Sequence, residues 1–152
     1  MAKKNRTGRS NGALGRFVGL PMYLLRTIAW QSLNPVARCA LIEVLQRYDG
    51  RNNGRLAMSG RMLAQAIGVS RATGTRALTE LCKRGFLEVV TPSAFSLKTR
   101  RATEYRVTLH RCDVSGNLPS KAFIRWKSEI HFTASPQGHH GITTEPHGPN
   151  AT

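Results

Sequence analysis

Acidic residues are scarce in this sequence. Only 8 of its 152 residues are Asp or Glu, against 23 Lys and Arg, which leaves a formal net charge of +15. The first acidic residue is Glu43. An excess of this size favours a polyanionic partner, and nucleic acid is the first candidate, because Lys and Arg neutralise backbone phosphates. The same charge is also compatible with a ribosomal type of basic protein or with a solvated basic surface.

Cysteines and long apolar runs are scarce too. Cys39, Cys82 and Cys112 are widely spaced and form no Cys-x-x-Cys pair, which argues against a disulfide framework and against a zinc ribbon. Residues 17–25 are apolar like a short signal sequence, but Pro21 interrupts them and no Ala-x-Ala cleavage site follows. No apolar run approaches the ~18 residues that span a bilayer. We therefore expect a cytoplasmic protein with no membrane partner.

Groups for catalysis or metal binding are also few. The acidic residues are scattered, no glycine-rich phosphate loop follows a predicted strand, and no Ser or Cys has a recognisable base. His139, His140 and His147 lie in an unpatterned segment with only Glu145 as a further ligand. Cys39 and Cys82 fall on predicted core faces of helices. We therefore predict no enzymatic activity, no metal site and no cofactor.

Both ends of the chain lack a periodic apolar pattern. Residues 1–16 combine Lys and Arg with Gly, Ser and Asn, and predict a flexible basic arm that adds unspecific affinity for phosphates. Residues 127–152 become rich in Pro, Gly, His and Thr, and predict a disordered tail. Residues 17–126 between them are long enough for one domain with a single core.

Two helices are indicated in the first third of the chain. Residues 20–33 have apolar side chains at helical spacing and predict one short amphipathic helix, through which a homodimer could form. Asn34 can cap a second helix, Pro35 suits its first position, and Gly50 can supply a left-handed stop. The core face of this second helix is expected to contain Ala37, Leu41, Val44, Leu45 and Tyr48.

A short strand and a third helix follow. The dipeptide Asn53-Gly54 predicts a turn, and residues 55–58 predict a small strand after it. Ser59 can cap a helix over residues 60–67. On that helix we expect the inward positions to be Met62, Leu63, Ala66 and Ile67.

The stretch AIGVSRATGTRAL, residues 66–78, interrupts one helical pattern and starts another. Gly68 can take the positive φ of a sharp turn, Val69 can anchor the turn in the core, and Ser70 can cap the new helix. Ala64 is small enough to allow close packing of the two helices. The pattern therefore predicts two helices that meet at a tight corner, as in a helix-turn-helix.

The second helix of this corner is predicted to have two unlike faces. At ~100° per residue its inward face contains Gly74, Ala77, Leu78, Leu81 and Cys82, and its outward face contains Ala72, Thr73, Arg76 and Lys83. In a major groove, Arg71 or Arg76 could bind guanine or a phosphate, Thr73 could donate to a base, and the Ala72 methyl could meet a thymine methyl. An ordinary helical hairpin with solvated arginines is the alternative. The candidate DNA-binding residues here are Ser70, Arg71, Ala72, Thr73, Thr75 and Arg76.

Two strands with a long basic loop between them come next. Gly85 can end the helix, and residues 83–90 then lead into a strand. Residues 103–109 alternate apolar and polar side chains and predict its partner. The loop TPSAFSLKTRRA between the strands contains no acidic residue, which predicts a wing along the DNA backbone or in the minor groove. A merely solvated loop is the alternative. Its candidate DNA-binding residues are Lys98, Arg100 and Arg101.

The segment LAQAIGVSRATGTRALTELCKRGFLEV resembles the winged helix-turn-helix proteins, which include bacterial transcriptional regulators and plasmid or phage replication initiators. The preceding LPMYLLRTIAWQSLNPVARCALIEVLQRYDGRNNG is similar to the lead-in of the initiator-like members. The resemblance covers residues 20–109 and implies a mainly α fold with a small β-hairpin wing, of the α+β class. It also implies sequence-specific binding of double-stranded DNA, first as a transcriptional regulator, with a replication initiator of a mobile element as the alternative. An RNA- or ribosome-associated basic protein remains a further alternative.

One residue departs from the family pattern. Gly74 stands where these proteins usually have Val or Ile. We expect the departure to remove core packing and to cost about 1 kcal/mol of helix propensity relative to Ala. Either the second helix is then loose when free, or Met62 or Phe86 fills the gap.

The residues after the predicted wing have no clear pattern. Phe123, Ile124 and Trp126 could pack back on the domain. Their basic neighbours could extend the basic surface or meet a second subunit; they are Lys121, Arg125 and Lys127.

Overall fold

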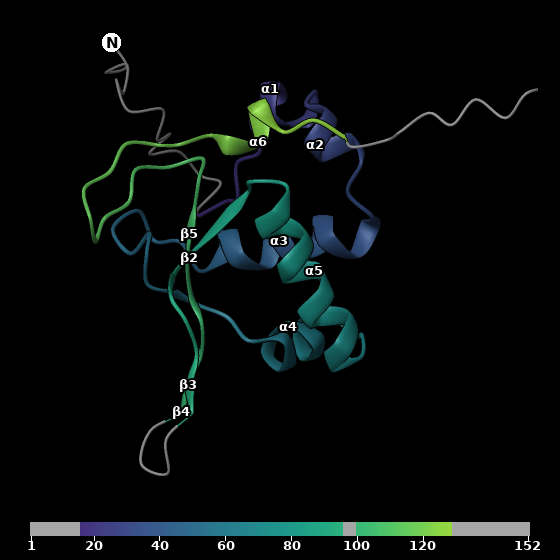
Figure 1. Ribbon diagram of the computed structural model, residues 1–152, viewed down its shortest axis with the longest axis vertical. Coiled ribbons are helices and arrows are strands. Elements are labelled where there is room, and N and C mark those ends of the chain that lie inside the picture. The colour runs from purple at the N-terminus through teal and green to yellow at the C-terminus, as the bar shows by residue number, and fades with distance from the viewer. Residues whose placement is uncertain (1–15, 96–99, 129–152) are drawn as a thin grey trace, which may run out of the picture.

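The computed structural model describes residues 16–95 and 100–128, which combine helices with a small antiparallel sheet and so belong to the α+β class (Figure 1). The helices are α1 (Met22–Leu25), α2 (Ile28–Gln31), α3 (Pro35–Gln46), α4 (Gly60–Ile67), α5 (Arg71–Lys83) and α6 (Ala122–Arg125). The strands are β1 (Leu56–Ala57), β2 (Leu87–Thr91), β3 (Ala94–Phe95), β4 (Arg100–Arg101) and β5 (Glu104–Val107).

The prediction of a single helix over residues 20–33 is wrong, because Thr27 divides this segment into α1 and α2. Thr27 has an extended backbone (φ −71°, ψ 148°), and its hydroxyl oxygen accepts a hydrogen bond from the backbone N–H of Trp30. The same hydroxyl donates to the carbonyl of Leu24 at 2.7 Å. A side chain that bonds to its local backbone competes with the helical ladder, and here it ends one helix and caps the next.

Helix α3 begins as predicted and ends earlier than predicted. The Asn34 side chain accepts from the Ala37 N–H at 2.8 Å. The helix ends at Gln46, so Gly50, although its φ is +99°, is not its stop. Instead, the Arg16 guanidinium donates to the carbonyls of Gln46 and Tyr48 at 2.8 and 2.6 Å. A cation here also interacts favourably with the negative end of the helix dipole.

The sheet has the strand order β1-β5-β2 and is antiparallel throughout. Its register pairs Leu56 with Tyr105 and Leu87 with Val107. The alternation predicted over residues 103–109 is reflected in burial: Tyr105 and Val107 of β5 are buried, and so is Leu109 beyond its end. Beyond the sheet, β3 pairs with β4 and extends the β2–β5 hairpin away from the core (Figure 1).

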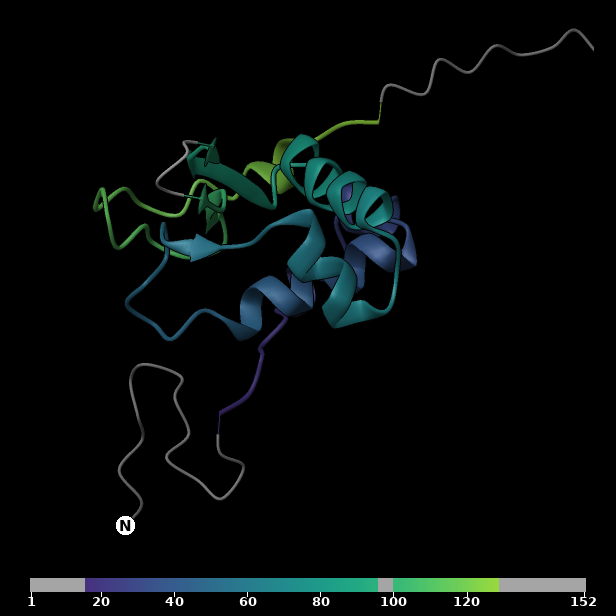
Figure 2. The same ribbon diagram turned by 90° about the horizontal axis from the view of Figure 1, so that it is seen from below.

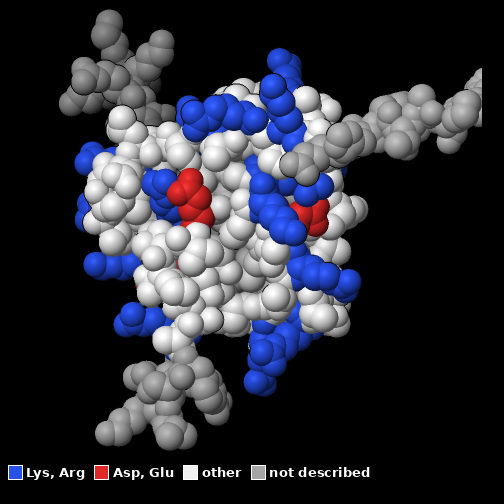
Figure 3. All heavy atoms as spheres, viewed as in Figure 1, with Lys and Arg blue, Asp and Glu red and all other residues white. Residues whose placement is uncertain are grey.

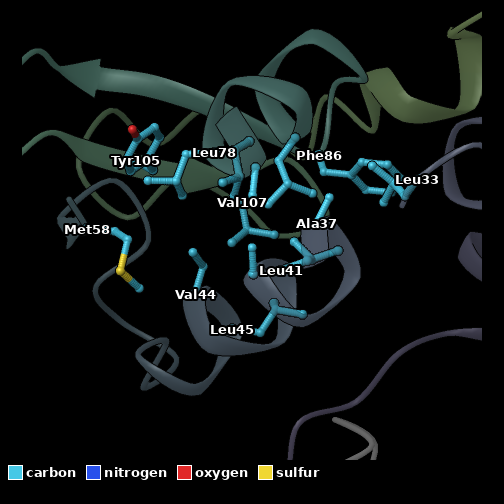
Figure 4. Close-up of a cluster of buried hydrophobic side chains, with 14 of the residues drawn as sticks. Leu33, Ala37, Leu41, Val44, Leu45, Met58, Leu78, Phe86, Tyr105 and Val107 are labelled. Carbon is cyan, nitrogen blue, oxygen red and sulfur yellow. The ribbon is translucent and has the colours of Figure 1, made fainter. Parts of the chain in front are cut away.

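The core lies between α3, α5 and the sheet, where Leu41, Leu78 and Val107 converge (Figure 4). The segment after β5 completes it. Phe123 of α6 is only 1% exposed and stacks on Phe86, with ring centroids 5.0 Å apart and planes 5° apart. The extension therefore packs back on the domain through Phe123, whereas Ile124 is exposed.

Asn53 is fully buried and joins the turn before β1 to the segment after β5. Its side-chain amide donates to the carbonyls of Val107, His110 and Arg111 at 3.0, 3.2 and 2.9 Å. Its Oδ1 accepts from the Val107 N–H at 2.7 Å, and its own N–H donates to Asp113. The sequence predicted only a turn here. The structure shows a fully hydrogen-bonded polar group, which is the condition for burying one.

Candidate nucleic-acid interface

Helices α4 and α5 meet at the tight corner that the sequence predicted. Gly68 has a φ of +70°, and Ser70 caps α5 by accepting from the Thr73 N–H at 3.2 Å. The Val69 N–H donates to the carbonyl of Ala64 at 3.0 Å, which closes the end of α4. Ser59 caps α4 in the same way, also as predicted. The start of α5 is therefore fixed by its own cap and by the turn before it.

The expectation that Gly74 leaves a packing gap is wrong, because the backbone of α4 occupies that space. A Cβ atom added at Gly74 would lie 2.5 Å from the carbonyl oxygen of Gly60 and 3.2 Å from the nitrogen of Ala64. Neither Met62 nor Phe86 fills a hole there. The two helices approach so closely that only glycine fits at this crossing.

The inward face of α4 is shifted from the predicted one. Met62 and Ala66 were expected to point inward, and both are exposed. Leu63 and Ala64 are the buried residues of this helix. The buried face of α4 differs from the predicted one because α5 packs against the side of α4 that contains Gly60 and Ala64.

Helix α5 has one buried and one exposed face, largely as predicted. Gly74, Ala77, Leu78 and Leu81 are buried. Thr73 and Cys82 are only half-buried, so neither belongs fully to the face predicted for it. Thr79 was not among the predicted site residues, although it follows Thr75 by one helical turn. The exposed residues of this helix are Arg71, Ala72, Thr75, Arg76, Thr79 and Lys83.

The hydroxyl groups along α5 are bound within the helix. The Thr73 Oγ1 lies 2.9 Å from the Ser70 Oγ and accepts from the Arg76 guanidinium at 3.4 Å. In the free protein this oxygen is a partner of Arg76; its donation to a base remains a prediction. The Thr75 Oγ1 donates to the carbonyl of Arg71 at 3.0 Å.

The hairpin of β3 and β4 and the α4–α5 corner lie toward the same end of the molecule (Figure 1). Figure 2, seen from that end, shows the hairpin on the left of the view and the corner on the right. In the hairpin, Ala94 pairs with Arg101 and Phe95 with Arg100. Arg101 is exposed. Lys98, the third predicted hairpin contact, lies outside the described residues.

Positive charge extends beyond the predicted residues. Arg61 on α4 is exposed and was not among them. Figure 3 shows Lys and Arg side chains spread over this face, with far fewer Asp and Glu among them. Glu80, the only acidic residue of α5, is paired with Arg84 at 3.2 Å and accepts from Asn34 at 2.6 Å. Its charge is therefore compensated locally.

Glu88 on β2 is compensated in the same way. Its carboxylate accepts from the Arg106 Nε at 2.8 Å and from Ser120 at 2.7 Å. Burial raises the pKa of Glu88, but the hydrogen bonds from Ser120 and Arg106 outweigh burial, so the pKa lies below its ordinary value. The group stays ionised near neutral pH, and its partner neutralises it.

The described residues offer little other chemistry. Within the described ranges, residues 16–95 and 100–128, no group of three or more His, Cys, Asp or Glu residues is placed to hold a metal ion. The histidines considered above, His139, His140 and His147, lie outside that part. Burial, with a smaller contribution from Glu88, raises the pKa of the Cys82 thiol to about 11, so this thiol is a poor nucleophile. No helix in these two ranges is long and apolar enough to cross a membrane.

The segment expected to form a homodimer contact lies on α1 and α2. Met22, Tyr23 and Ile28 are exposed there, and contact with a second copy remains a prediction. No family model, no curated protein and no solved structure matches the chain.

Proposed function

We propose that this chain is a winged helix-turn-helix protein that binds double-stranded DNA sequence-specifically. Helix α5 would enter the major groove, and the hairpin of β2 to β5 would follow the backbone or the minor groove as the wing. The observation that carries the proposal is the exposed face of α5. It begins at a capped helix start, contains Arg71 and Arg76, and has no acidic residue from position 70 to 79.

The exposed arginines suggest two kinds of DNA contact, one to bases and one to phosphates. Arg76 is held in place by Thr73 and can form two hydrogen bonds with the O6 and N7 of guanine. Arg71 lies in the first turn of α5, where the helix N-terminus and the Ser70 cap also favour a phosphate. Arg61 at the start of α4 and Arg101 on the hairpin are exposed and would bind the DNA backbone. Phosphate contacts of this kind fix orientation, and base contacts supply specificity.

The biological role would be occupancy of a DNA site. Regulation of transcription is the first choice, and a replication initiator of a mobile element is the second. Both roles need the same contact with DNA and differ in what is recruited. A homodimer would select a palindromic site, so the symmetry of the selected sequence reports the assembly.

The test is selection of bound sites from random duplexes with the full chain, followed by titrations of the selected duplex at several salt concentrations. If Arg76 reads a base, Arg76→Ala should weaken binding by about 1–3 kcal/mol and relax specificity at one position. If Arg71 binds a phosphate, Arg71→Ala should weaken binding to all sequences alike and reduce the salt slope by about one. Arg125→Ala is the matched control, because it removes the same charge from an exposed position on α6, away from α4 (Figure 1).

Two results would contradict the proposal. The first is that Arg71→Ala and Arg76→Ala bind the selected duplex as tightly as the parent protein. The second is that a single-stranded RNA pool competes for the protein more strongly than any duplex does. The second result would favour an RNA- or ribosome-associated protein, in which the helix pair serves only as scaffold.

A further inference from the structure

Thr75 is exposed on α5, and its hydroxyl is hydrogen-bonded to the backbone of its own helix. The Oγ1 donates to the Arg71 carbonyl at 3.0 Å. It also faces α4, because a Cβ added at Gly60 would lie 2.0 Å from this oxygen. The side chain is nevertheless exposed. Because the hydroxyl is engaged with the helix backbone, we take the γ-methyl group as the part of Thr75 that is left for contact with a ligand.

The neighbours of Thr75 on this face are of the same kind. Ala72, almost one turn before Thr75, has only a methyl group to offer and is exposed. Thr79, one turn further on, also donates its hydroxyl to a helix carbonyl, that of Thr75, at 3.1 Å. At ~100° per residue these three residues lie between Arg71 and Arg76 on the helix surface. An apolar centre is therefore bordered by two guanidinium groups.

We infer that Thr75 is a specificity-determining residue. Its γ-methyl group would contact the C5 methyl group of a thymine in the major groove. This inference rests on the proposed function. The thymine methyl is the apolar group that the four standard base pairs display in the major groove, where the other groups are hydrogen-bond donors and acceptors. A threonine whose hydroxyl is already donated has no proton left for a base. The γ-methyl group of such a threonine can still contact the methyl group of thymine, and this contact excludes water from both.

The inference differs from the sequence prediction in which threonine matters. The sequence prediction gave Thr73 as a donor to a base and included Thr75 only among the candidate DNA-binding residues. Thr73 is half-buried, and its hydroxyl lies within hydrogen-bond distance of Ser70 and Arg76. Thr73 acts through Arg76, and Thr75 faces the DNA. The selected site should therefore contain a thymine close to the guanine that Arg76 binds.

The experiment removes the two methyl groups separately and together. In the selected duplex, each thymidine is replaced in turn by deoxyuridine, which deletes the C5 methyl and changes nothing else on the base edge. Thr75→Ser deletes the γ-methyl and retains the hydroxyl and its hydrogen bond to Arg71. At one thymine position the parent protein should lose about fourfold in affinity with uracil, the effect of burying one methyl group. Thr75→Ser should lose the same factor on thymine and should not distinguish thymine from uracil at that position.

Thr27→Ser is the matched control variant. It makes the same chemical change at the N-cap of α2 and retains both hydrogen bonds of the Thr27 hydroxyl. This variant should bind like the parent and keep the full preference for thymine. Equal binding of the parent to all uracil duplexes would overturn the inference, and so would a Thr75→Ser variant that still prefers thymine as strongly as the parent. In both cases the parent still binds its selected duplex, so the proposed function would stand; a chain that selects no duplex would refute the proposed function itself.

The C5 methyl group also occurs in 5-methylcytosine, and a further pair of duplexes separates the two sources. Cytosine and 5-methylcytosine are placed at the sensitive position, each opposite guanine. A gain from methylation equal to the gain of thymine over uracil would show that Thr75 reads the methyl group alone. A gain limited to thymine would show that the adenine partner is read together with the methyl. Both results support a contact between Thr75 and a C5 methyl group. They differ in whether the methyl group of 5-methylcytosine is recognised as well as that of thymine.

Discussion

The close approach of α4 and α5 makes a sharp prediction for Gly74→Ala. On helix propensity alone this change should stabilise the protein by about 1 kcal/mol. The structure predicts the opposite, because the new Cβ would lie 2.5 Å from the carbonyl oxygen of Gly60, where ordinary contact begins near 3.4 Å. The helices would have to separate by about 0.9 Å, and this carbonyl belongs to a helix backbone that cannot rotate aside.

The magnitude follows from the two opposing terms. Overpacking in a well-packed interior costs about 1–3 kcal/mol, and a backbone clash belongs at the upper end of that range. With the propensity gain subtracted, we expect a net loss of about 2 kcal/mol in the free energy of unfolding. For a domain of this size the loss corresponds to roughly 8 °C in Tm. Circular dichroism melts and urea titrations of the parent and the variant measure both quantities.

Two further glycines supply the controls. A Cβ at Gly68 meets nothing within 4 Å, but the φ of +70° is strained for alanine, so Gly68→Ala should cost about 1–2 kcal/mol for a purely conformational reason. Gly19→Ala should be nearly neutral, because its nearest contact is an ordinary 3.6 Å. If Gly74→Ala is as stable as the parent or more stable, then the helices do not cross as closely as described, and the reasoning fails.

Two other predictions concern stability and pH. Asn53→Ala should cost at least about 3 kcal/mol in urea titrations, because it removes the side-chain donor to the His110 and Arg111 carbonyls, one of two donors to the Val107 carbonyl, and the acceptor of the Val107 N–H. The exposed Asn117→Ala should change little, and a loss below about 1 kcal/mol for Asn53→Ala would show that water replaces the amide. The His110 ring stacks on the Tyr48 ring, with centroids 4.7 Å apart. Burial, opposed by Asp113, lowers the pKa of His110 below its ordinary value of 6.5. The folded state therefore binds fewer protons than the unfolded state, and the free energy of unfolding should fall as the pH decreases from about 6.5. His110→Phe keeps the stacked ring without the titration, and melts between pH 7.5 and 5 should show a smaller loss for this variant; equal losses would mean that other groups cause the decline. Protonation of Glu88 does not contribute in this pH range. Its pKa is lowered, so the stability that its ionised form provides is lost only below about pH 4.5.

The local features of the fold were predictable because each depends on residues close in sequence. The caps at Asn34, Ser59 and Ser70 need only a side-chain oxygen three residues before a free N–H, and all three are present. The left-handed turn at Gly68 is of the same kind. The outward face of α5 followed from helical periodicity, which placed Ala72, Arg76 and Lys83 correctly at the surface, whereas Thr73 is only half-buried.

Two of the failures depend on where another part of the chain lies, and the others on the directions of individual side chains. The role of Gly74 is set by the backbone of α4, and the role of Asn53 by carbonyls 54 to 58 residues away. For Thr73 and Thr75 the residue types were noticed, but the directions of the hydroxyls depend on rotamers that periodicity does not specify. The break at Thr27 arises from a side-chain bond that competes with a pattern otherwise typical of one helix.

The stacking of Phe123 on Phe86 has a consequence for synthesis of the chain. Phe86 is made well before Phe123, so a growing polypeptide has an open core on this side until α6 leaves the ribosome. A product ended by a premature stop codon ahead of α6 would keep an aromatic side chain in water and would be degraded or would aggregate. Truncated copies therefore should not accumulate as competitors of the complete protein, even though every element from β1 to β5 would already be present in them.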